Sequence, residues 1–336
     1  MLLKAQPERY PGLASIRTVF TVHNLGYQGL FSPGEWGLLG LDADIFSPQG
    51  LEFYGNINFL KGGLVFAEAL TTVSPTYARE IRTSEGGFGL EGVLQQRAAS
   101  LFGILNGADY EVWNPATDPF IAQPYTSDDP SGKRACKADL QAVFGLARDP
   151  RIPLLGIVSR LVSQKGFDLI TTVLDELLKR DLQFVLLGSG EKQYEDYFRS
   201  IAPRYAGKVG VRIAFEEVLT HKIEAGADMF LMPSRYEPSG LNQLYSLKYG
   251  TIPIVRVTGG LKDSIEEFDP ETGKGNGFCF QSYDRSALLD AVDRALAAFH
   301  DENQWAALMK NAMTADYSWN RSASEYLNLY QRLTRK

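Results

Sequence analysis

The sequence predicts an α/β protein with two doubly wound domains, the first of which lacks its N-terminal part. Two observations lead to this fold class. From about residue 151 to 315, short apolar runs alternate with helical patterns, which is typical of a parallel sheet covered by helices on both faces. Before residue 108 the same alternation gives only three strands, about half of such a sheet.

The strands of the second domain are predicted by continuous apolar runs bounded by glycine, proline or serine. These runs are IPLLGIVS (152–159), LQFVLLGSG (182–190), VGVRIAF (209–215), MFLMPS (229–234) and TIPIVRV (251–257). Apolar residues at helical spacing predict helices over 167–180 and 285–300. We therefore expect a complete domain over residues 141–315.

The first domain is predicted over residues 1–140. Its strands are expected at 18–24, 69–74 and 102–107, with a helix over 57–69. A polar segment with proline and glycine predicts the linker near 126–141. A domain usually has about 100–150 residues or more, so we expect a preceding segment to be missing.

Composition excludes several classes of function. The net charge of −6 argues against general nucleic-acid binding. No apolar run approaches the roughly 18 residues that span a bilayer, and the first residues lack the apolar core of a signal peptide. Cys136 and Cys279 have no pairing or zinc pattern, which indicates a reducing compartment, and we expect a cytoplasmic protein without bound metal.

The loops after the predicted strands carry the residues that indicate a ligand. In open α/β sheets, ligands bind beyond the carboxyl ends of the strands. Arg160 and Lys165 follow the first strand of the second domain and lie beside a helix start at Gly166, an arrangement that favours an anion such as phosphate. Glu237, in the loop after the fourth strand, suits sugar hydroxyls instead. Together these residues predict a nucleotide-sugar site.

Six motifs in order then carry a family resemblance. They are TVHNLGYQGLF, NFLKGGLVFAEALTTVSPTYAREI, GILNGADYEVWNP, SRLVSQKGFDLI, ADMFLMPSRYEPSGLNQLYSLKYGTIPIVRVTGGLKDS and YSWNRSASEYLNLYQRL. They span the chain from about residue 17 to its end. The sequence resembles the bacterial glycogen synthases, which are ADP-glucose-dependent retaining glycosyltransferases. The resemblance implies the GT-B architecture, with two Rossmann-like domains facing across a cleft, and a C-terminal helix within 316–336 that packs back on the first domain.

The resemblance implies catalytic roles for four residues. Arg160 and Lys165 match the basic pair that grips the donor diphosphate and stabilises the leaving ADP. Glu237 matches the carboxylate that contacts the glucose hydroxyls. His23, in the motif VHN, matches the histidine that faces the transferred glucose.

Further residues are implied in substrate binding. Phe215 lies where the family usually has a tyrosine that stacks on adenine, so the ring is kept and the hydroxyl is lost. The remaining residues of this group lie in the last two loops of the sheet and comprise Gly240, Leu241, Thr258, Gly259 and Gly260.

The implied reaction transfers glucose from ADP-glucose to the 4-OH at the non-reducing end of an α-1,4-glucan, with retention and without cofactor or metal. Two alternatives stay open at this point: a GT-B enzyme with another nucleotide-sugar donor, and an incomplete or inactive module that binds glucan or nucleotide. The family's Lys-x-Gly-Gly-Leu loop has no counterpart here, so we expect a separate N-terminal segment as a possible partner. The KGGL at 61–64 is interpreted as helix packing.

Simpler interpretations exist for several of these residues. Glu237 could be a helix-start charge, His23 could be a core histidine, and Phe215 could belong to the core. The sequence Asp42-Ala43-Asp44 resembles the metal motif of a different glycosyltransferase architecture, and we expect no metal there.

Overall fold

The structure is a computed structural model that describes residues 2–13 and 15–335. The chain forms two compact units. The first consists of Met1–Asn106 with Ser322–Lys336, and the second of Gly107–Arg321. Among the described residues, no helix is both long and apolar enough to cross a membrane.

The second unit is built on a six-stranded sheet with the strand order β12-β11-β10-β7-β8-β9. All neighbouring strands run parallel. The strands are β7 (Leu154–Val158), β8 (Gln183–Leu187), β9 (Val209–Arg212), β10 (Met229–Met232), β11 (Ile252–Arg256) and β12 (Phe278–Phe280). The five predicted strands are therefore confirmed, and β12 was not predicted because its apolar run is only three residues long.

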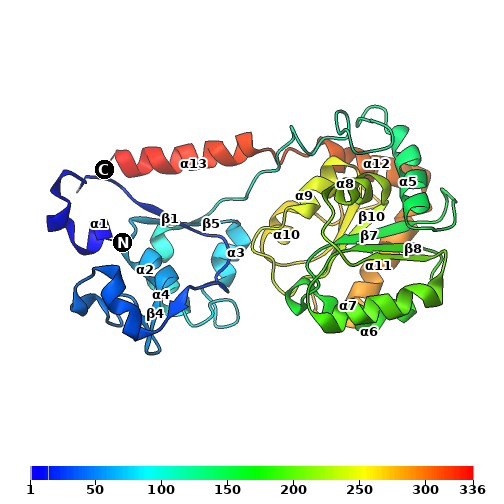
Figure 1. Cartoon of the computed structure of the whole chain (residues 1–336). Coiled ribbons are helices and arrows are strands. Elements are labelled where there is room, and N and C mark those ends of the chain that lie inside the picture. The colour runs from blue at the N-terminus through cyan, green and yellow to red at the C-terminus, as the bar shows by residue number, and fades with distance from the viewer. Residues whose placement is uncertain (1, 14, 336) are drawn as a thin grey trace. The chain divides into compact units, whose positions relative to one another are not determined.

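Helices cover both faces of this sheet, as Figure 1 shows for the second unit. One face carries α6 (Phe167–Leu177), α7 (Lys192–Ile201) and α11 (Arg285–Phe299). The other carries α5 (Gly132–Val143), α8 (Glu217–Gly226), α9 (Asn242–Lys248) and α12 (Glu302–Thr314). Because both faces are covered, the strands are apolar throughout: Phe184, Phe230 and Ile254 are at most 1% exposed.

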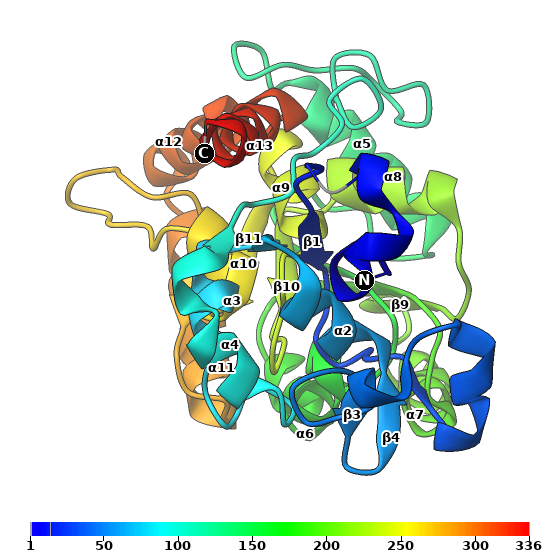
Figure 2. The same ribbon diagram turned by 90° about the vertical axis from the view of Figure 1, so that its left-hand side faces the viewer.

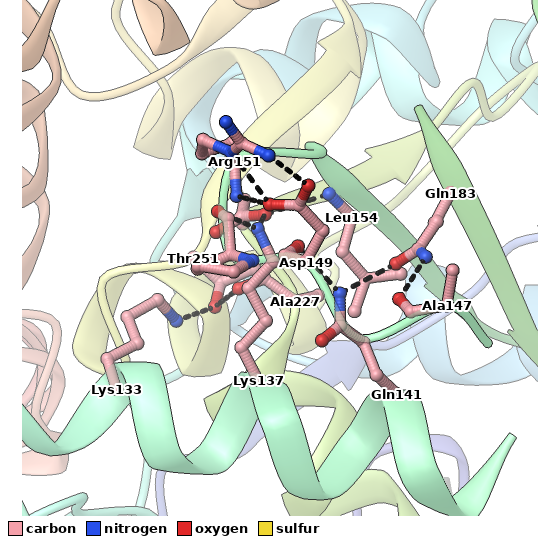
Figure 3. A network of polar contacts seen from close by, with 12 residues as sticks. Lys133, Lys137, Gln141, Ala147, Asp149, Arg151, Leu154, Gln183, Ala227 and Thr251 are labelled. Carbon is pink, nitrogen blue, oxygen red and sulfur yellow. Dashed lines mark hydrogen bonds and ion pairs between the residues drawn. The ribbon is translucent and has the colours of Figure 1, made fainter. Parts of the chain in front are cut away.

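Helix α5 is fixed to the amino ends of the strands by buried polar side chains (Figure 3). The ammonium group of Lys133 donates to the carbonyl oxygens of Ala225 and Tyr249 and to the hydroxyl of Thr251, at 2.7–3.1 Å. Lys137 forms a 2.6 Å ion pair with Asp228. These bonds satisfy groups that the helix would otherwise bury without partners.

The linker prediction near 126–141 is therefore wrong over its second half, where α5 begins at Gly132. The structure divides the chain between residues 106 and 107, not near residue 140. The physical reason is burial: Ile121, Tyr125 and Cys136 form one apolar cluster with Tyr249 and Met313 of the second unit.

The first unit contains two small sheets. β1 (Val19–Val22), β5 (Ala69–Thr72) and β6 (Leu101–Gly103) run parallel in the order β1-β5-β6, which confirms the three predicted strands. A second, antiparallel sheet of β2 (Leu30–Phe31), β4 (Asn56–Asn58) and β3 (Glu52–Phe53) was not predicted. Figure 2 shows its β3–β4 hairpin. Strands of two or three residues are too short for a hydrophobic alternation to be recognised.

Short helices accompany the first parallel sheet, namely α1 (Leu2–Ala5), α2 (Phe59–Phe66), α3 (Pro75–Glu80) and α4 (Glu91–Gln96). The KGGL sequence lies inside α2, as interpreted. Lys61 is buried and donates to the carbonyl oxygens of Pro48 and Glu52. A Cβ on Gly63 would lie 2.4 Å from the ring of Phe20. Both residues therefore serve packing.

The last helix, α13 (Trp319–Thr334), brings an apolar stripe to the first unit. Leu329 is 4% exposed and packs with Ala69 and Ile104, and Tyr326 and Leu333 lie against the same cluster. Tyr330 does not share this face, since it is 47% exposed.

Glu224 gives a testable consequence of the fold. It is fully buried in α8, accepts a 2.6 Å hydrogen bond from Ser246, and leaves Oε1 without a hydrogen-bond partner in the described part of the chain. Burial raises the pKa of Glu224 from 4.5 to about 8, against the hydrogen bond from Ser246 and the charge of Lys133. Between pH 4.5 and pH 8 only the folded state holds the proton of Glu224. The stabilisation that this proton gives is complete below the unfolded pKa and is lost as the pH rises through the folded pKa.

The native chain should lose stability from pH 5 to pH 8 as Glu224 ionises, whereas Glu224→Gln cannot ionise. We therefore expect the unfolding free energy of Glu224→Gln minus that of the native chain to rise by at least about 1 kcal/mol between pH 5 and pH 8. Urea unfolding followed by circular dichroism at both pH values measures this difference. Stabilities that change in parallel with pH would show that Glu224 does not titrate as described.

Candidate active site

The candidate site begins at the carboxyl end of β7. The chain leaves the strand at Ser159, passes Arg160, and forms a 3-10 turn over Ser163–Lys165 before α6. Gly166 joins the turn to the helix with φ of +86°, and a Cβ there would lie 2.2 Å from the carbonyl oxygen of Pro233. Only glycine fits this position, so the predicted helix start beside Lys165 is confirmed.

Lys165 and Glu237 form the central contact of the site. The Lys165 Nζ lies 2.6 Å from Glu237 Oε2, and the side chains are 21% and 6% exposed. Ser234 Oγ donates to the same carboxylate oxygen at 3.0 Å. The family resemblance implies separate roles for these two charges, and the structure brings them into direct contact.

Hydrogen bonds from the backbone and from side-chain amides hold the neighbouring loops together. The N–H of Arg235 donates to Gln164 at 2.9 Å, and the Gln164 side chain donates to the carbonyl of Tyr236 at 3.3 Å. At the start of α9, Asn242 donates to the carbonyl oxygen of Val158 at 2.7 Å. The loops after β7 and β10 therefore form one connected rim.

The loop from Thr258 to Gly260 packs on the backbone of the Glu237 loop. Thr258 is buried and precedes α10 (Gly259–Ser264). A Cβ on Gly259 would lie 1.9 Å from the carbonyl oxygen of Glu237, and one on Gly260 would lie 2.0 Å from that of Ser239. The N–H of Gly260 donates to the carbonyl of Glu237 at 3.0 Å. This N–H is thus engaged by the protein itself, and the implied role of the loop in substrate binding stays a prediction.

A cavity of about 450 Å³ opens beside these loops. Its lining comes from the ends of β7, β8 and β9 and from the start of α9, and includes Arg160, Ser189, Phe215, Asn242 and Tyr245. Such a volume with a largely apolar lining and a few polar groups is typical of a small-molecule site. Arg160 and Phe215, which the sequence analysis selected independently, therefore lie at one cavity.

Gly240 and Leu241 lie next to this lining. Gly240 has φ of +67°, and Leu241 is 38% exposed and directly precedes α9. They shape the turn that presents Asn242.

The simpler interpretations of three residues are wrong. Phe215 is 93% exposed and does not belong to the core. His23 follows β1 in the first unit and is also exposed. Glu237 lies five positions before the first residue of α9 and is bonded to Lys165, so it is not a helix-start charge.

Trp113 is one of the residues at this cavity that the sequence analysis missed. Its ring stacks between His221 at 3.9 Å and Tyr245 at 4.0 Å, with interplanar angles of 5° and 7°. His221 is held by Asp118, whose carboxylate lies 2.7 Å from its Nδ1. The available signal was the position of Trp113 within the motif GILNGADYEVWNP, since an aromatic side chain alone indicates no chemistry.

Within the described ranges, no group of three or more His, Cys, Asp or Glu side chains could hold a metal ion. Asp42 of the Asp-Ala-Asp sequence accepts a hydrogen bond from Arg9 at 3.2 Å.

Comparisons with known proteins agree with this geometry. Residues 1–96 match the family described as starch synthase catalytic domain, and residues 142–312 match glycosyl transferases group 1. The glycogen synthase of Koribacter versatilis is 52% identical over 99% of this chain, which covers 68% of that protein. The glycogen synthase of Anaeromyxobacter sp. (strain Fw109-5) is 53% identical, with coverage of 99% and 70%.

Solved structures give the same result. The catalytic domain of starch synthase IV from Arabidopsis thaliana, bound to ADP and acarbose, matches with a TM-score of 0.93 and 39% identity, over 99% of this chain and 70% of the other. A sucrose-phosphate synthase from Thermosynechococcus elongatus matches with a TM-score of 0.58 at 18% identity, which shows the fold alone.

The fold and these families define a glycosyltransferase of the GT-B type with Rossmann-like units. More narrowly, the chain belongs to the glycogen synthase family. The predicted family and fold class are therefore confirmed.

Phe215 offers a test of the cavity. Because its ring is 93% exposed, Phe215→Ala should leave thermal stability unchanged. Loss of a ring that stacks on a base should weaken ADP binding by about 5- to 100-fold. Calorimetry with ADP measures the affinity, and Leu38→Ala, at a site that is 85% exposed in the first unit, is the matched control. Equal ADP affinities for the two variants would exclude Phe215 from the base site.

Proposed function

We propose that this protein transfers glucose from ADP-glucose to the 4-OH at the non-reducing end of an α-1,4-glucan, with retention of anomeric configuration. The observation that carries the proposal is that the loop after β7 holds both Arg160, which lines a cavity with Phe215, and Lys165, which pairs with Glu237. Supporting it, the similar starch synthase IV is described with ADP and acarbose bound.

The proposed reaction requires the enzyme to stabilise a leaving diphosphate. Negative charge on ADP grows as the glycosidic bond breaks, and cations that bind this charge more tightly in the transition state raise turnover. Arg160 can bind two oxygens in its fork, whereas Lys165 acts as a point charge at the end of a flexible chain. We assign both residues to the diphosphate.

Glu237 serves two groups in this proposal. Its carboxylate holds Lys165 and Ser234 through Oε2, and it accepts hydrogen bonds from the glucose hydroxyls. In this role the carboxylate contacts the sugar hydroxyls and not the anomeric carbon. We therefore assign the proton of the attacking 4-OH to the leaving phosphate, without a covalent enzyme intermediate.

Three finer assignments accompany the proposal. The reaction is placed in the cytoplasm, in keeping with two cysteines that are both free thiols. A separate N-terminal segment with a Lys-x-Gly-Gly-Leu loop is kept as a proposed partner. Adding that segment to the purified chain and measuring the gain in activity tests the second assignment. The contact of His23 with the transferred glucose is proposed on the family motif alone.

The proposal is tested by incorporation of labelled glucose from ADP-glucose into glycogen. We expect the purified chain to incorporate label and the double variant Arg160→Ala, Lys165→Ala to lose at least about 100-fold, because two charge-assisted contacts to the diphosphate disappear. Arg285→Ala, which removes an exposed arginine paired with Glu176 on the surface, is the matched control.

Competition among ADP-, UDP- and GDP-glucose in the same assay identifies the donor. A preference for UDP- or GDP-glucose would change the assigned donor and would leave the assignment as a glycosyltransferase unchanged. Binding of ADP by calorimetry without any incorporation would contradict the proposal for this chain and would favour a module that binds nucleotide only.

A further inference from the structure

A second cavity lies wholly within the first unit and has no role in the proposed transfer. It is open, has a volume of about 530 Å³, and is lined by α3, β6 and α13. This volume falls in the range of small-molecule sites. Neither the family motifs nor the reaction assigns it a ligand.

The charge around this cavity is unbalanced. Arg79, Arg82 and Arg332 line it, together with a single carboxylate, that of Glu325. Among the described residues, none of these three arginines forms an ion pair, whereas Arg17 of the same unit lies 3.7 Å from Glu68. Three guanidinium groups around one space repel one another, and an anion between them removes this cost.

Local hydrogen bonds orient two of these arginines. Arg79 Nη2 donates to Thr76 Oγ1 at 2.7 Å, and Arg82 Nε donates to the carbonyl oxygen of Ala78 at 3.0 Å. Each guanidinium has five N–H donors, so further donors remain for a ligand. An arginine held in this way loses less freedom on binding and can engage phosphate oxygens in pairs.

The rest of the lining indicates what the anion is attached to. Leu101, Ile104 and Leu329 give an apolar floor, and Asn328 and Glu325 project amide and carboxylate groups from α13. A carboxylate is unsuited to phosphate but accepts hydrogen bonds from hydroxyl groups.

We propose that this cavity is a binding site for a small phosphate ester of the sugar-phosphate class. The three arginines bind the phosphate, and Glu325 and Asn328 bind the hydroxyl groups. The site is independent of the proposed function, since all its residues belong to the first unit while Arg160, Lys165 and Glu237 belong to the second.

Calorimetry with glucose 1-phosphate tests the proposal. The full chain carries Arg160→Ala and Lys165→Ala, so that the donor site is disabled. We expect saturable binding that Arg79→Gln with Arg332→Gln weakens at least about tenfold, because two charge-assisted hydrogen bonds are lost. Arg335→Gln removes the same charge near the end of α13 but does not line the cavity, and it should leave the affinity unchanged.

Three results would overturn the proposal: no binding of glucose 1-phosphate at millimolar concentration, equal affinity in the Arg79–Arg332 variant, or equal loss in Arg335→Gln. A circular dichroism spectrum and a melting temperature equal to those of its parent chain show that the Arg79→Gln, Arg332→Gln variant is folded. Failure of the donor site would appear in ADP calorimetry on the chain with Arg160 and Lys165 intact, and would leave the glucose 1-phosphate result interpretable.

Binding of inorganic phosphate, as a second probe, distinguishes the contribution of the phosphate group from that of the sugar group. Glu325→Gln should weaken glucose 1-phosphate several-fold, since a strong acceptor for hydroxyls is lost, and should not weaken inorganic phosphate. Equal affinities for the two probes in the chain with Glu325, or loss of both in Glu325→Gln, would contradict the assignment of the sugar group.

Discussion

The ion pair between Lys165 and Glu237 is the contact on which the candidate site depends. It joins the loop after β7 to the loop after β10, two strands that are neighbours in the sheet although 70 residues apart in the chain. Because Glu237 is only 6% exposed, its charge requires the nearby lysine and the hydroxyl of Ser234. Under the proposed function, a diphosphate that enters this site competes with Glu237 for the same ammonium group, and Lys165 thereby links donor binding to sugar binding.

Cationic side chains have different partners at the two edges of the second unit's sheet. At the amino ends, Lys133 and Lys137 spend their donors on carbonyl oxygens, Thr251 and Asp228, and thereby fix α5. At the carboxyl ends, Arg160 lines a cavity and Lys165 pairs with Glu237. The difference between the two edges follows from the parallel sheet. All carboxyl ends of its strands lie at one edge, and ligands of open α/β sheets bind at that edge.

The sequence predicted the strands of the sheet and selected residues that lie at the candidate site, and the reasons for its failures are specific. Long apolar runs such as LQFVLLGSG identify their strands without ambiguity, whereas β2, β3 and β12 are two or three residues long and leave no periodic signal. Most of helix α5 falls in the segment predicted as a linker because that segment opens with polar, proline and glycine residues, and only the structure shows the buried acceptors of its lysines. The motifs located Arg160, Lys165 and Glu237, but the contact between Lys165 and Glu237 depends on strand order, which sequence does not give.

The most direct test of this account is the ADP affinity and the glucose-transfer rate of Glu237→Gln. If Lys165 is shared between Glu237 and the diphosphate, removal of the carboxylate charge releases the lysine. ADP should then bind as tightly as before or more tightly, while glucose transfer falls by about 100-fold or more because a charged acceptor for the sugar hydroxyls is lost. A variant that loses ADP affinity would show that Glu237 serves only to position Lys165. A variant with undiminished transfer would show that the carboxylate does not contact the sugar.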